Sequence, residues 1–297
     1  MSINSDPRIP SCAVLLAAYN GEQWVEEQLR SILDQEGVDV TIFISVDLST
    51  DKTLAICSQF EAQEPRVKVL DYGQRFGSAG ANFFRLIKDV DVSEFDMVAF
   101  SDQDDIWLPD KVITAWNKLS SRECDVYSGD VVAFWESGRE QLIKKSYPQK
   151  RLDHFFEAAG PGCTYVFCCD AFAAVKTMVV DNYDTLKNIS LHDWTIYAFC
   201  RQAGYRWFID DKPKMRYRQH ENNQVGTNNN LKAYLKRLSS VSGSWYKTEV
   251  NRIAALCGRD LSESLSSRVF LIKNIAQLRR RPRDCLALLL MLLLGIY

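Results

Sequence analysis

Short apolar runs alternate with amphipathic segments between residues 12 and 119, and this alternation constrains the fold more than any other feature. The apolar runs, which we interpret as buried strands, are Cys12–Ala18, Val40–Val46, Val67–Leu70 and Met97–Phe100. The segments with apolar residues at helical spacing are Glu22–Leu33, Asp51–Phe60, Ala81–Ile87 and Val112–Leu119. Alternation of this kind predicts an α/β fold, with a mostly parallel sheet and helices on both of its faces.

The pattern is less regular in the middle of the chain. A helix is expected at Trp194–Cys200, and short strands are expected at Val126–Tyr127, Val131–Trp135, Thr164–Cys168, Trp207–Ile209 and Met215–Arg218. From Leu231 onward the pattern is helical only, and Pro282 interrupts it before a final apolar run. The economical division is one α/β domain over residues 1–228 and a helical extension over residues 229–297.

Polar residues follow three of the expected strands, after Ala18, Val46 and Phe100. Open α/β sheets bind ligands at the carboxyl ends of their strands, so these residues are candidates for a site. The third cluster contains Asp102, Asp104 and Asp105. Such close carboxylates repel one another, and Mg²⁺ or Mn²⁺ typically joins them to substrate phosphates. The alternative is a solvated acidic turn that caps the next helix.

The composition indicates which binding partners and which cellular compartment to expect. The net charge of −2 provides no global basic field that would hold nucleic acid. Nine cysteines form no Cys-x-x-Cys pair, which favours a reduced cytosol over a disulfide framework. The N-terminal residues have neither the basic start nor the apolar stretch of a signal peptide.

Three motifs together resemble glycosyltransferase family 2, the inverting enzymes of the Rossmann-like GT-A fold. They are Ala17-Ala18-Tyr19-Asn20-Gly21 after the first strand, Ser45-Val46-Asp47-Leu48-Ser49-Thr50-Asp51 after the second, and Asp102-Gln103-Asp104-Asp105 after the fourth. Their order and spacing match the family across residues 12–110. The resemblance implies a metal-dependent transferase that takes a sugar from a nucleotide-diphosphate donor.

The resemblance assigns donor contacts to Ala17, Tyr19 and Asn20 in the opening motif. It implies that Asp47 accepts a hydrogen bond from a pyrimidine base, and that Asp102 faces the ribose. Asp104 would bind the metal ion on the diphosphate, where a divalent cation stabilises the leaving charge. One departure is Val46, which stands where the family usually has the first of two acids.

Inversion also needs a general base for the acceptor hydroxyl. His192-Asp193-Trp194 is similar to the family's site at a helix start, so Asp193 is the candidate base. The alternative is an N-cap aspartate that opens the helix at Trp194.

The segment Tyr217-Arg218-Gln219-His220-Glu221-Asn222-Asn223, with Ser-Asp-Gln-Asp-Asp-Ile-Trp at the metal motif, resembles the rhamnosyltransferases of surface-polysaccharide assembly. Members of that branch transfer L-rhamnose or related sugars from dTDP or UDP donors. Arg216 and Arg218 would contact donor phosphates, because arginine suits bidentate phosphate contacts. His220 would bind the metal. On the acceptor side the candidates are Gly162, Cys163, Thr164 and Trp194.

Residues 268–297, at the C-terminus, suggest that the protein contacts a membrane surface. Arg279, Arg280, Arg281 and Arg283 precede an apolar stretch over residues 285–297. This stretch is shorter than the roughly 20 apolar residues that span a bilayer, but it could lie in the interface near anionic headgroups. A buried helix or a homo-oligomer contact is the alternative. The first hypothesis places a bacterial enzyme on the inner face of the cytoplasmic membrane, with a lipid-linked glycan as acceptor.

Three functional classes remain open from the sequence. The first is a glycosyltransferase that uses dTDP-rhamnose or a UDP-hexose. The second is a sugar nucleotidyltransferase, which needs a glycine-rich phosphate loop, whereas the first loop here has a single glycine, Gly21. The third is a non-catalytic binding protein, which only Val46 favours.

Overall fold

The computed structural model describes residues 8–186, 189, 191–220 and 245–297. Its larger sheet has seven strands in the order β10-β6-β9-β4-β1-β2-β3. The strands are β1 (Ser11–Ala18), β2 (Asp39–Val46), β3 (Val67–Val69), β4 (Met97–Ser101), β6 (Val126–Gly129), β9 (Val166–Cys168) and β10 (Trp207–Asp210). All neighbours are parallel except β9, which runs antiparallel to β4 and β6. The mostly parallel sheet predicted from the sequence is therefore confirmed.

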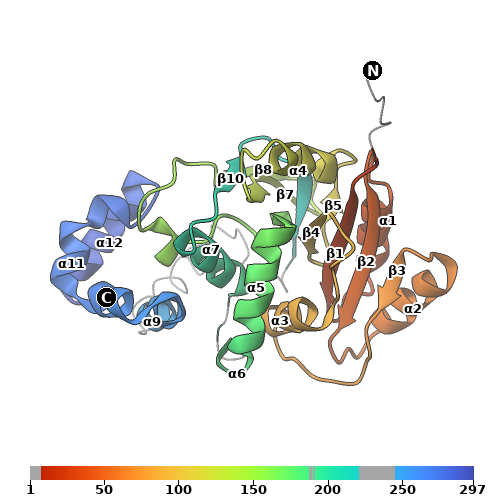
Figure 1. Cartoon of the computed structure of the whole chain (residues 1–297), viewed down its shortest axis with the longest axis horizontal. Coiled ribbons are helices and arrows are strands. Elements are labelled where there is room, and N and C mark those ends of the chain that lie inside the picture. Colours follow the sequence, from red (N-terminus) through yellow and green to blue (C-terminus); the bar gives the residue numbers. More distant parts are fainter. Residues whose placement is uncertain (1–7, 187–188, 190, 221–244) are drawn as a thin grey trace, which may run out of the picture.

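Helices cover both faces of this sheet (Figure 1). One face packs on α1 (Val25–Leu33), α2 (Thr53–Gln63) and α4 (Lys111–Ser120), and the other on α3 (Ala79–Asp89), α5 (Cys169–Asp181), α6 (Tyr183–Leu186) and α7 (His192–Gln202). In β1, Val14 and Leu16 face the first layer and Ala13 and Leu15 face the second. Because both faces are buried, the strand is apolar throughout instead of alternating.

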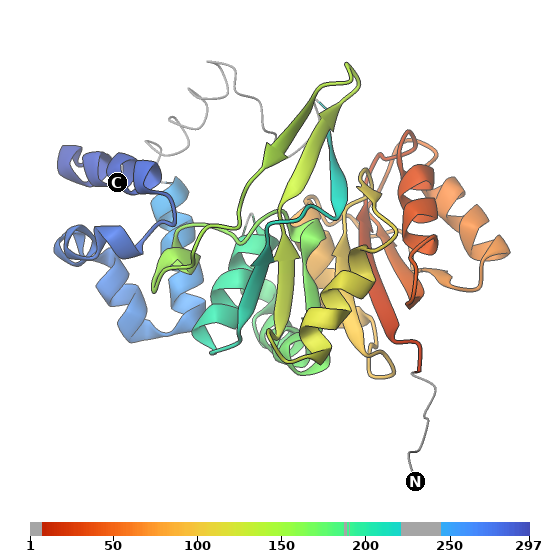
Figure 2. The ribbon, with the colours of Figure 1, turned by 90° about the horizontal axis from the view of Figure 1, so that it is seen from above.

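A second sheet of four strands stands beside the first, in the order β5-β11-β7-β8. It consists of β5 (Ile106–Trp107), β7 (Val131–Trp135), β8 (Glu140–Ile143) and β11 (Met215–Gln219). In Figure 2 the yellow-green strands β7 and β8 project away from the larger sheet. The sequence patterns predicted β7 and β11 but neither β5 nor β8. This sheet matters for function because β5 directly follows the acidic residues and β11 carries Arg216 and Arg218.

The helical extension gathers at the end of the molecule opposite β1–β3 (Figure 1). It contains α9 (Trp245–Cys257), α10 (Arg259–Ser266), α11 (Arg268–Lys273), the 3₁₀ turn η3 (Ile275–Gln277) and α12 (Pro282–Leu294). A third core cluster joins α7 and the 3₁₀ turn η1 (Asp153–Phe155) to these helices. The predicted division at residues 228–229 lies outside the described residues. Within the described part of the chain, no helix has the length and apolarity required to span a bilayer.

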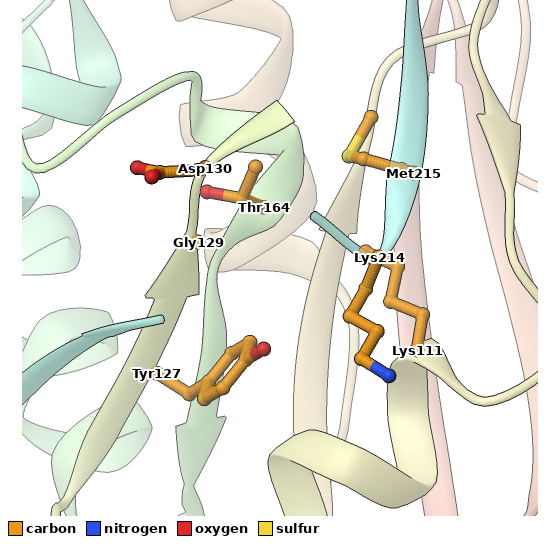
Figure 3. Close-up of a pocket in the computed structure, with 7 residues that line it drawn as sticks. All are labelled: Lys111, Tyr127, Gly129, Asp130, Thr164, Lys214 and Met215. Atoms are coloured by element: carbon orange, nitrogen blue, oxygen red, sulfur yellow. The ribbon is translucent and has the colours of Figure 1, made fainter. Parts of the chain in front are cut away.

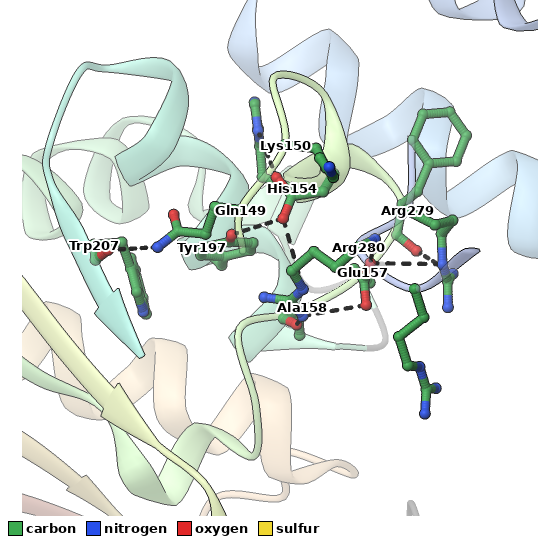
Figure 4. A network of polar contacts seen from close by, with 12 residues as sticks. Gln149, Lys150, His154, Glu157, Ala158, Tyr197, Trp207, Arg279 and Arg280 are labelled. Atoms are coloured by element: carbon green, nitrogen blue, oxygen red, sulfur yellow. Dashed lines mark hydrogen bonds and ion pairs between the residues drawn. The ribbon is translucent and has the colours of Figure 1, made fainter. Parts of the chain in front are cut away.

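The arginines before α12 do not lie where the membrane hypothesis placed them. Arg280 is 4% exposed, and it pairs with Glu157 at 3.2 Å and Asp153 at 3.6 Å (Figure 4). Arg279 donates to the Phe156 carbonyl at 2.6 Å. These two guanidinium groups fasten the extension to the α/β domain, so the expectation that they meet lipid headgroups is wrong.

Candidate active site

The polar segments after β1, β2 and β4 meet at one edge of the larger sheet. Ala18 is in register with Val46, and Leu16 is in register with Ser101, so the three strands end side by side. Ala17 is 8% exposed and belongs to the core of β1. The donor contact of Ala17 stays a prediction, and Tyr19, two residues later, is 50% exposed.

Gln103 joins the loop after β1 to the acidic segment. Its side-chain oxygen accepts from the Tyr19 N–H at 2.7 Å, and its amide nitrogen donates to the Tyr19 carbonyl at 2.8 Å. A Cβ on Gly21 would lie 2.2 Å from that same oxygen, so any larger residue there would displace the Gln103 amide. Asn20 has a left-handed backbone (φ 45°), and its side-chain oxygen accepts from the Thr50 N–H at 2.8 Å. The loop after β1 is thus held in place by side-chain contacts, and the role of Gln103 in it was not predicted from the sequence.

Asp47 lies at the end of β2 and is 4% exposed. Its carboxylate accepts from the backbone N–H groups of Leu48 at 2.7 Å, Phe76 at 2.8 Å and Gly77 at 2.8 Å. These bonds orient the carboxylate and hold the loop before α3 against it. The side chains of Tyr19 and Tyr72, each at least 40% exposed, are the large apolar surfaces of the adjoining loops.

The acidic triplet divides into two parts. Asp104 lies 2.7 Å from the Nε2 atom of His220, whose ring stacks on Trp24 with centroids 4.0 Å apart. Asp102 and Asp105 instead converge with Cys163, with ligand atoms within 4.8 Å of one another. The structure therefore brings together the two residues predicted to bind metal, and it places Cys163 beside the carboxylates. The residues 221–226 that completed the sequence motif lie outside the described residues.

Burial and nearby carboxylates make Asp102 and Asp105 hard to ionise. Burial, together with the Asp104 and Asp193 carboxylates, raises the pKa of Asp102 to about 7. Burial also raises the pKa of Asp105 well above its usual value, and the Cys163 thiol pKa is raised for the same reason. Asp105 accepts the Arg218 N–H at 3.1 Å with one oxygen, and its other oxygen has no partner among the described residues. A carboxylate set with a spare buried oxygen fits a divalent cation.

Asp193 lies in the first turn of α7, which begins one residue earlier at His192. Its carboxylate accepts from the Trp194 N–H at 2.8 Å, so it is not the N-cap residue. Burial raises the pKa of Asp193 to about 6, against the opposing effects of the Trp194 N–H and of Lys145. A Cβ on Gly162 would lie 3.2 Å from the Asp193 Cβ and 2.6 Å from His192, so the loop before β9 approaches this helix closely.

The remaining acceptor-side candidates are buried. Trp194 is 3% exposed, donates its indole N–H to the His154 carbonyl at 2.9 Å and stacks on Tyr246. Thr164 is also 3% exposed and donates to the Pro161 carbonyl at 2.8 Å. Their burial favours a supporting role for both residues, and direct contact with an acceptor stays a prediction.

Behind the acids lies a small pocket between the two sheets (Figure 3). Its lining comprises Lys111, Tyr127, Gly129, Asp130, Thr164, Lys214 and Met215. The Lys111 ammonium is buried and lies 3.2 Å from the centroid of the Trp107 ring. This pocket is too small for a sugar.

The two predicted donor arginines have different environments on β11. Arg218 donates to the Asp104 carbonyl at 2.8 Å and pairs with Glu27. Arg216 reaches across β7 to Glu140 on β8 at 2.9 Å, and its donor contact stays a prediction. Tyr217, on the opposite face of β11, lies among Cys163 and the three aspartates, and burial raises the pKa of its hydroxyl well above the usual value. Because side chains alternate between the two faces of a strand, the position of Tyr217 between the two arginines could have identified it from the sequence.

Comparisons with known proteins agree with this geometry. The family model described as "Glycosyl transferase family 2" matches residues 13–184. The chain is 46% identical to the dTDP-rhamnosyl transferase RfbG of Shigella flexneri, over 95% of this chain and 100% of that protein. It is 30% identical to the putative teichuronic acid biosynthesis glycosyltransferase TuaG of Bacillus subtilis, over 50% of this chain and 53% of that protein.

Two solved structures share the fold at low identity. Staphylococcus aureus TarS 1–349 in complex with UDP-GlcNAc has a TM-score of 0.56 at 16% identity, covering 94% of this chain and 83% of that one. The mannosyltransferase PcManGT from Pyrobaculum calidifontis, in complex with GDP-Man and Mn²⁺, has a TM-score of 0.52 at 14% identity, covering 97% of this chain and 81% of that one. These similarities confirm the fold class predicted from the sequence.

Proposed function

Because this chain belongs to glycosyltransferase family 2, we propose that it transfers L-rhamnose from a dTDP donor to a hydroxyl of a lipid-linked surface polysaccharide. The observation that carries the proposal is the 46% identity to a dTDP-rhamnosyl transferase over nearly the whole chain. The convergence of Asp47, Asp102, Asp104 and Asp193 at one edge of the sheet supplies the chemistry.

The donor nucleotide would lie over the ends of β1 and β2. Asp47 is already oriented by three backbone N–H groups, and a free lone pair on its carboxylate would accept from the N–H of a thymine ring. Tyr19 and Tyr72 offer exposed rings on either side for the base and ribose. Asp102 would face the ribose and the diphosphate.

The diphosphate would lie against Asp104 and His220, with Mn²⁺ or Mg²⁺ between them and the phosphate oxygens. When bound, the cation stabilises the negative charge that develops on the leaving dTDP. The Asp104–His220 contact, the unpartnered oxygen of Asp105 and the raised pKa of Asp102 support a cation at this position. Arg218 would hold the acidic loop in place through the Asp104 carbonyl.

Asp193 would act as the general base. Its carboxylate would take the proton of the acceptor hydroxyl as that oxygen attacks the anomeric carbon, on the face opposite the bond to dTDP. That bond breaks with its electrons on the phosphate, so the configuration of the sugar inverts. A pKa of about 6 keeps the carboxylate ionised at neutral pH and makes it a stronger base than an ordinary aspartate.

We also propose that the enzyme works at the inner face of the bacterial cytoplasmic membrane. Helix α12 exposes Leu286, Leu290, Leu293 and Leu294, each at least 51% exposed, and Ile296 follows at 43%. These positions share one side of the helix, and such an apolar strip suits a membrane interface. Replacing Leu290 and Leu294 with Ser should reduce co-sedimentation with phosphatidylglycerol vesicles. Equal sedimentation of the variant would remove the membrane from the proposal, and concentration-dependent self-association that the variant loses would assign the strip to a homo-oligomer.

The test of function is a donor screen with the purified chain and Mn²⁺. We expect dTDP-rhamnose to raise the melting temperature more than UDP-glucose, UDP-GlcNAc or GDP-mannose. When Mn²⁺ is present, Asp104→Ala should weaken donor binding about tenfold and so reduce this stabilisation. In EDTA the substitution should have little effect. A clear preference for a UDP-hexose would replace the rhamnose proposal with a hexosyltransferase, and stabilisation without any transfer would favour a binding protein.

A further inference from the structure

The loop 71–77 joins β3 to α3 and lies against Asp47, the residue proposed to bind the donor base. Phe76 and Gly77 donate their backbone N–H groups to the two oxygens of the Asp47 carboxylate, each at 2.8 Å. Tyr72, in the same loop, carries one of the exposed rings proposed for the base and ribose. The loop has no helix or strand of its own, and most of its residues are exposed. Such a segment keeps one conformation only if other contacts offset its conformational entropy.

Arg85, in the middle of α3, contacts this loop near both of its ends. The residue is buried, with an exposed fraction of 6%. One terminal nitrogen of its guanidinium donates to the Asp71 carbonyl at 2.9 Å, and the guanidinium carbon lies 5.4 Å from the centroid of the Phe76 ring. A guanidinium can donate from its edge while its face meets an aromatic ring. A single side chain therefore holds the first residue of the loop and one of the residues that donate to Asp47.

The same guanidinium is bonded to the strand that carries Asp47. Its other terminal nitrogen donates to the Ser45 hydroxyl at 2.8 Å, and Ser45 is a fully buried residue of β2, two positions before Asp47. The Nε atom donates to the Asp89 carboxylate at 3.1 Å, which compensates the buried positive charge. Arg85 thus joins the loop 71–77 to β2. A lysine ammonium lacks the planar fork of donors that makes these bonds together.

Asn82 lies three residues before Arg85, on the same face of α3, and extends this network to β1. Its side-chain oxygen accepts from the Ser45 hydroxyl, and its amide nitrogen donates to the carbonyls of Ser45 at 2.9 Å and Ala18 at 3.4 Å. The Ala18 carbonyl also accepts from the Asp47 N–H at 2.8 Å. The buried polar side of α3 therefore fixes the ends of β1 and β2 and the loop 71–77 relative to one another.

We propose that Arg85 is a positioning residue for donor binding: it holds the loop 71–77 on β2, so that the N–H groups of Phe76 and Gly77 keep Asp47 oriented toward the base. Arg85 is buried beneath the loop, so it acts through Asp47 and Tyr72 and not by contact with the nucleotide. This inference rests on the proposed function and adds to its donor side a residue that the motifs do not contain.

The direct test is calorimetric titration of the full chain with dTDP in the presence of Mn²⁺. Arg85→Lys keeps the charge but loses bonds to the loop, so it should weaken dTDP binding about tenfold. In turnover assays the KM for the donor should rise by a similar factor while kcat stays within about twofold, because Asp193 is untouched. The matched control is Lys88→Met, which removes a partly exposed cation that also pairs with Asp89 and should change neither value. Unchanged dTDP affinity in Arg85→Lys, or an equal loss in Lys88→Met, would overturn the proposal.

Amide hydrogen exchange tests the contact with the loop in the absence of any nucleotide. The amides of Phe76 and Gly77 should exchange at least about tenfold faster in Arg85→Lys, whereas the amide of Leu15 in β1 should exchange as in the unchanged protein. Uniform acceleration of all three amides would mean that Arg85 only stabilises the fold, and it would overturn the proposal.

A second variant keeps the test decisive if Arg85→Lys fails to fold. Phe76→Leu removes the ring beneath the guanidinium but retains the backbone N–H that donates to Asp47. We expect it to weaken dTDP binding about threefold, since a cation–π contact contributes less than the lost hydrogen bonds. Where both single variants fold, the double variant should lose less than the two effects combined, because they act through one contact. Unchanged affinity in Phe76→Leu, or full additivity, would contradict the proposal.

Failure of the proposed function would give different results. If the unchanged protein binds UDP more tightly than dTDP, the donor assignment is wrong, and the loss of affinity in Arg85→Lys is measured with UDP instead. If the unchanged protein binds a nucleotide but transfers no sugar, the proposed activity is wrong, while weaker binding in Arg85→Lys still supports the role of Arg85. Normal transfer together with equal nucleotide affinity in Arg85→Lys and the unchanged protein would contradict the role of Arg85 alone.

Discussion

The two sides of the candidate site are built by different means. On the proposed donor side, the ends of β1, β2 and β4 carry the polar residues, and the side chains of Asp47 and Gln103 are held by backbone groups. On the acceptor side, the loop around Gly162 is backed by buried ion pairs such as Arg280–Glu157, which join segments 123 residues apart. The donor side therefore depends on local backbone geometry, and the acceptor side depends on the docking of the extension.

The largest expected difference between the two sides of the site comes from replacing Asp193, the proposed base. Asp193→Asn should reduce kcat by about 10³-fold, within the usual range for a general base, because the amide cannot take a proton. Donor affinity should change little, because the donor side is fixed independently. Asp170→Asn is a matched control, since Asp170 is likewise the second residue of its helix, α5, and is exposed. Wild-type turnover in Asp193→Asn would show that another group is the base.

The next largest effect concerns the ion pairs that hold the extension. Arg280→Gln should lower the free energy of unfolding by about 1.5–3 kcal/mol, because it removes a buried guanidinium from Asp153 and Glu157, which keep only Arg201 and Arg279 as cationic partners among the described residues. Urea denaturation measures this change. Arg283→Gln is the control, with a side chain 78% exposed, and should shift stability by less than about 0.5 kcal/mol. Equal effects from both variants would mean that the extension is not held by this network.

The pH dependence of the reaction tests the acceptor side without a mutation. Since the folded pKa of Asp193 is about 6, kcat/KM for the acceptor should fall about tenfold per pH unit below pH 6 and level off above pH 7. The same raised pKa means that the folded protein holds the Asp193 proton more tightly than the unfolded chain does. The stability that this proton contributes is fully present below about pH 4 and is lost as the pH rises through 6. Asp193→Asn should accordingly unfold at a higher urea concentration than the unchanged protein at pH 8. A flat profile between pH 5 and 8 would count against Asp193 as the base.

The smallest effect should come from the donor platform. Gly21→Ala places a Cβ against the Gln103 side chain and should weaken donor binding by about 1–2 kcal/mol, because the flexible amide must move and release Tyr19. Thermal shift with dTDP measures the loss. The double variant Gly21→Ala with Gln103→Ala should remove the clash but not restore affinity, because the two bonds to Tyr19 are lost. Full affinity in Gly21→Ala alone would show that the platform is not rigid.

The donor side was largely predictable from the sequence, because its chemistry follows the ends of hydrophobic strands. The runs at β1, β2 and β4 set the sheet, and Asp47 and Asp104 follow β2 and β4. The roles of these residues and of Asp193 stay predictions. Asp104 and His220, which the sequence predicted to bind one metal ion, are in contact, and their role as metal ligands stays a prediction.

The second sheet and the roles of several charged residues could not be predicted in the same way. Strand β5 has two residues and β8 is half exposed, so neither gives a hydrophobic run. Arg216 was assigned from its residue type, but its partner Glu140 lies 76 residues away. The basic run before α12 suggested a surface, yet Arg280 is buried because Asp153 and Glu157 are brought to it only by the tertiary fold. Sequence patterns report periodicity, and they do not report which charges meet.

The place of Cys163 among the aspartates has a consequence for the chemical resilience of the enzyme. A thiol reacts with electrophiles and oxidants as its thiolate, and the carboxylates around Cys163 keep it protonated while burial keeps reagents out. Cys169 is the exposed cysteine of the described residues, and it lies at the start of α5 rather than at the reacting centre. We therefore expect an alkylating dye to modify Cys169 before Cys163, although burial raises the thiol pKa of Cys169 as well.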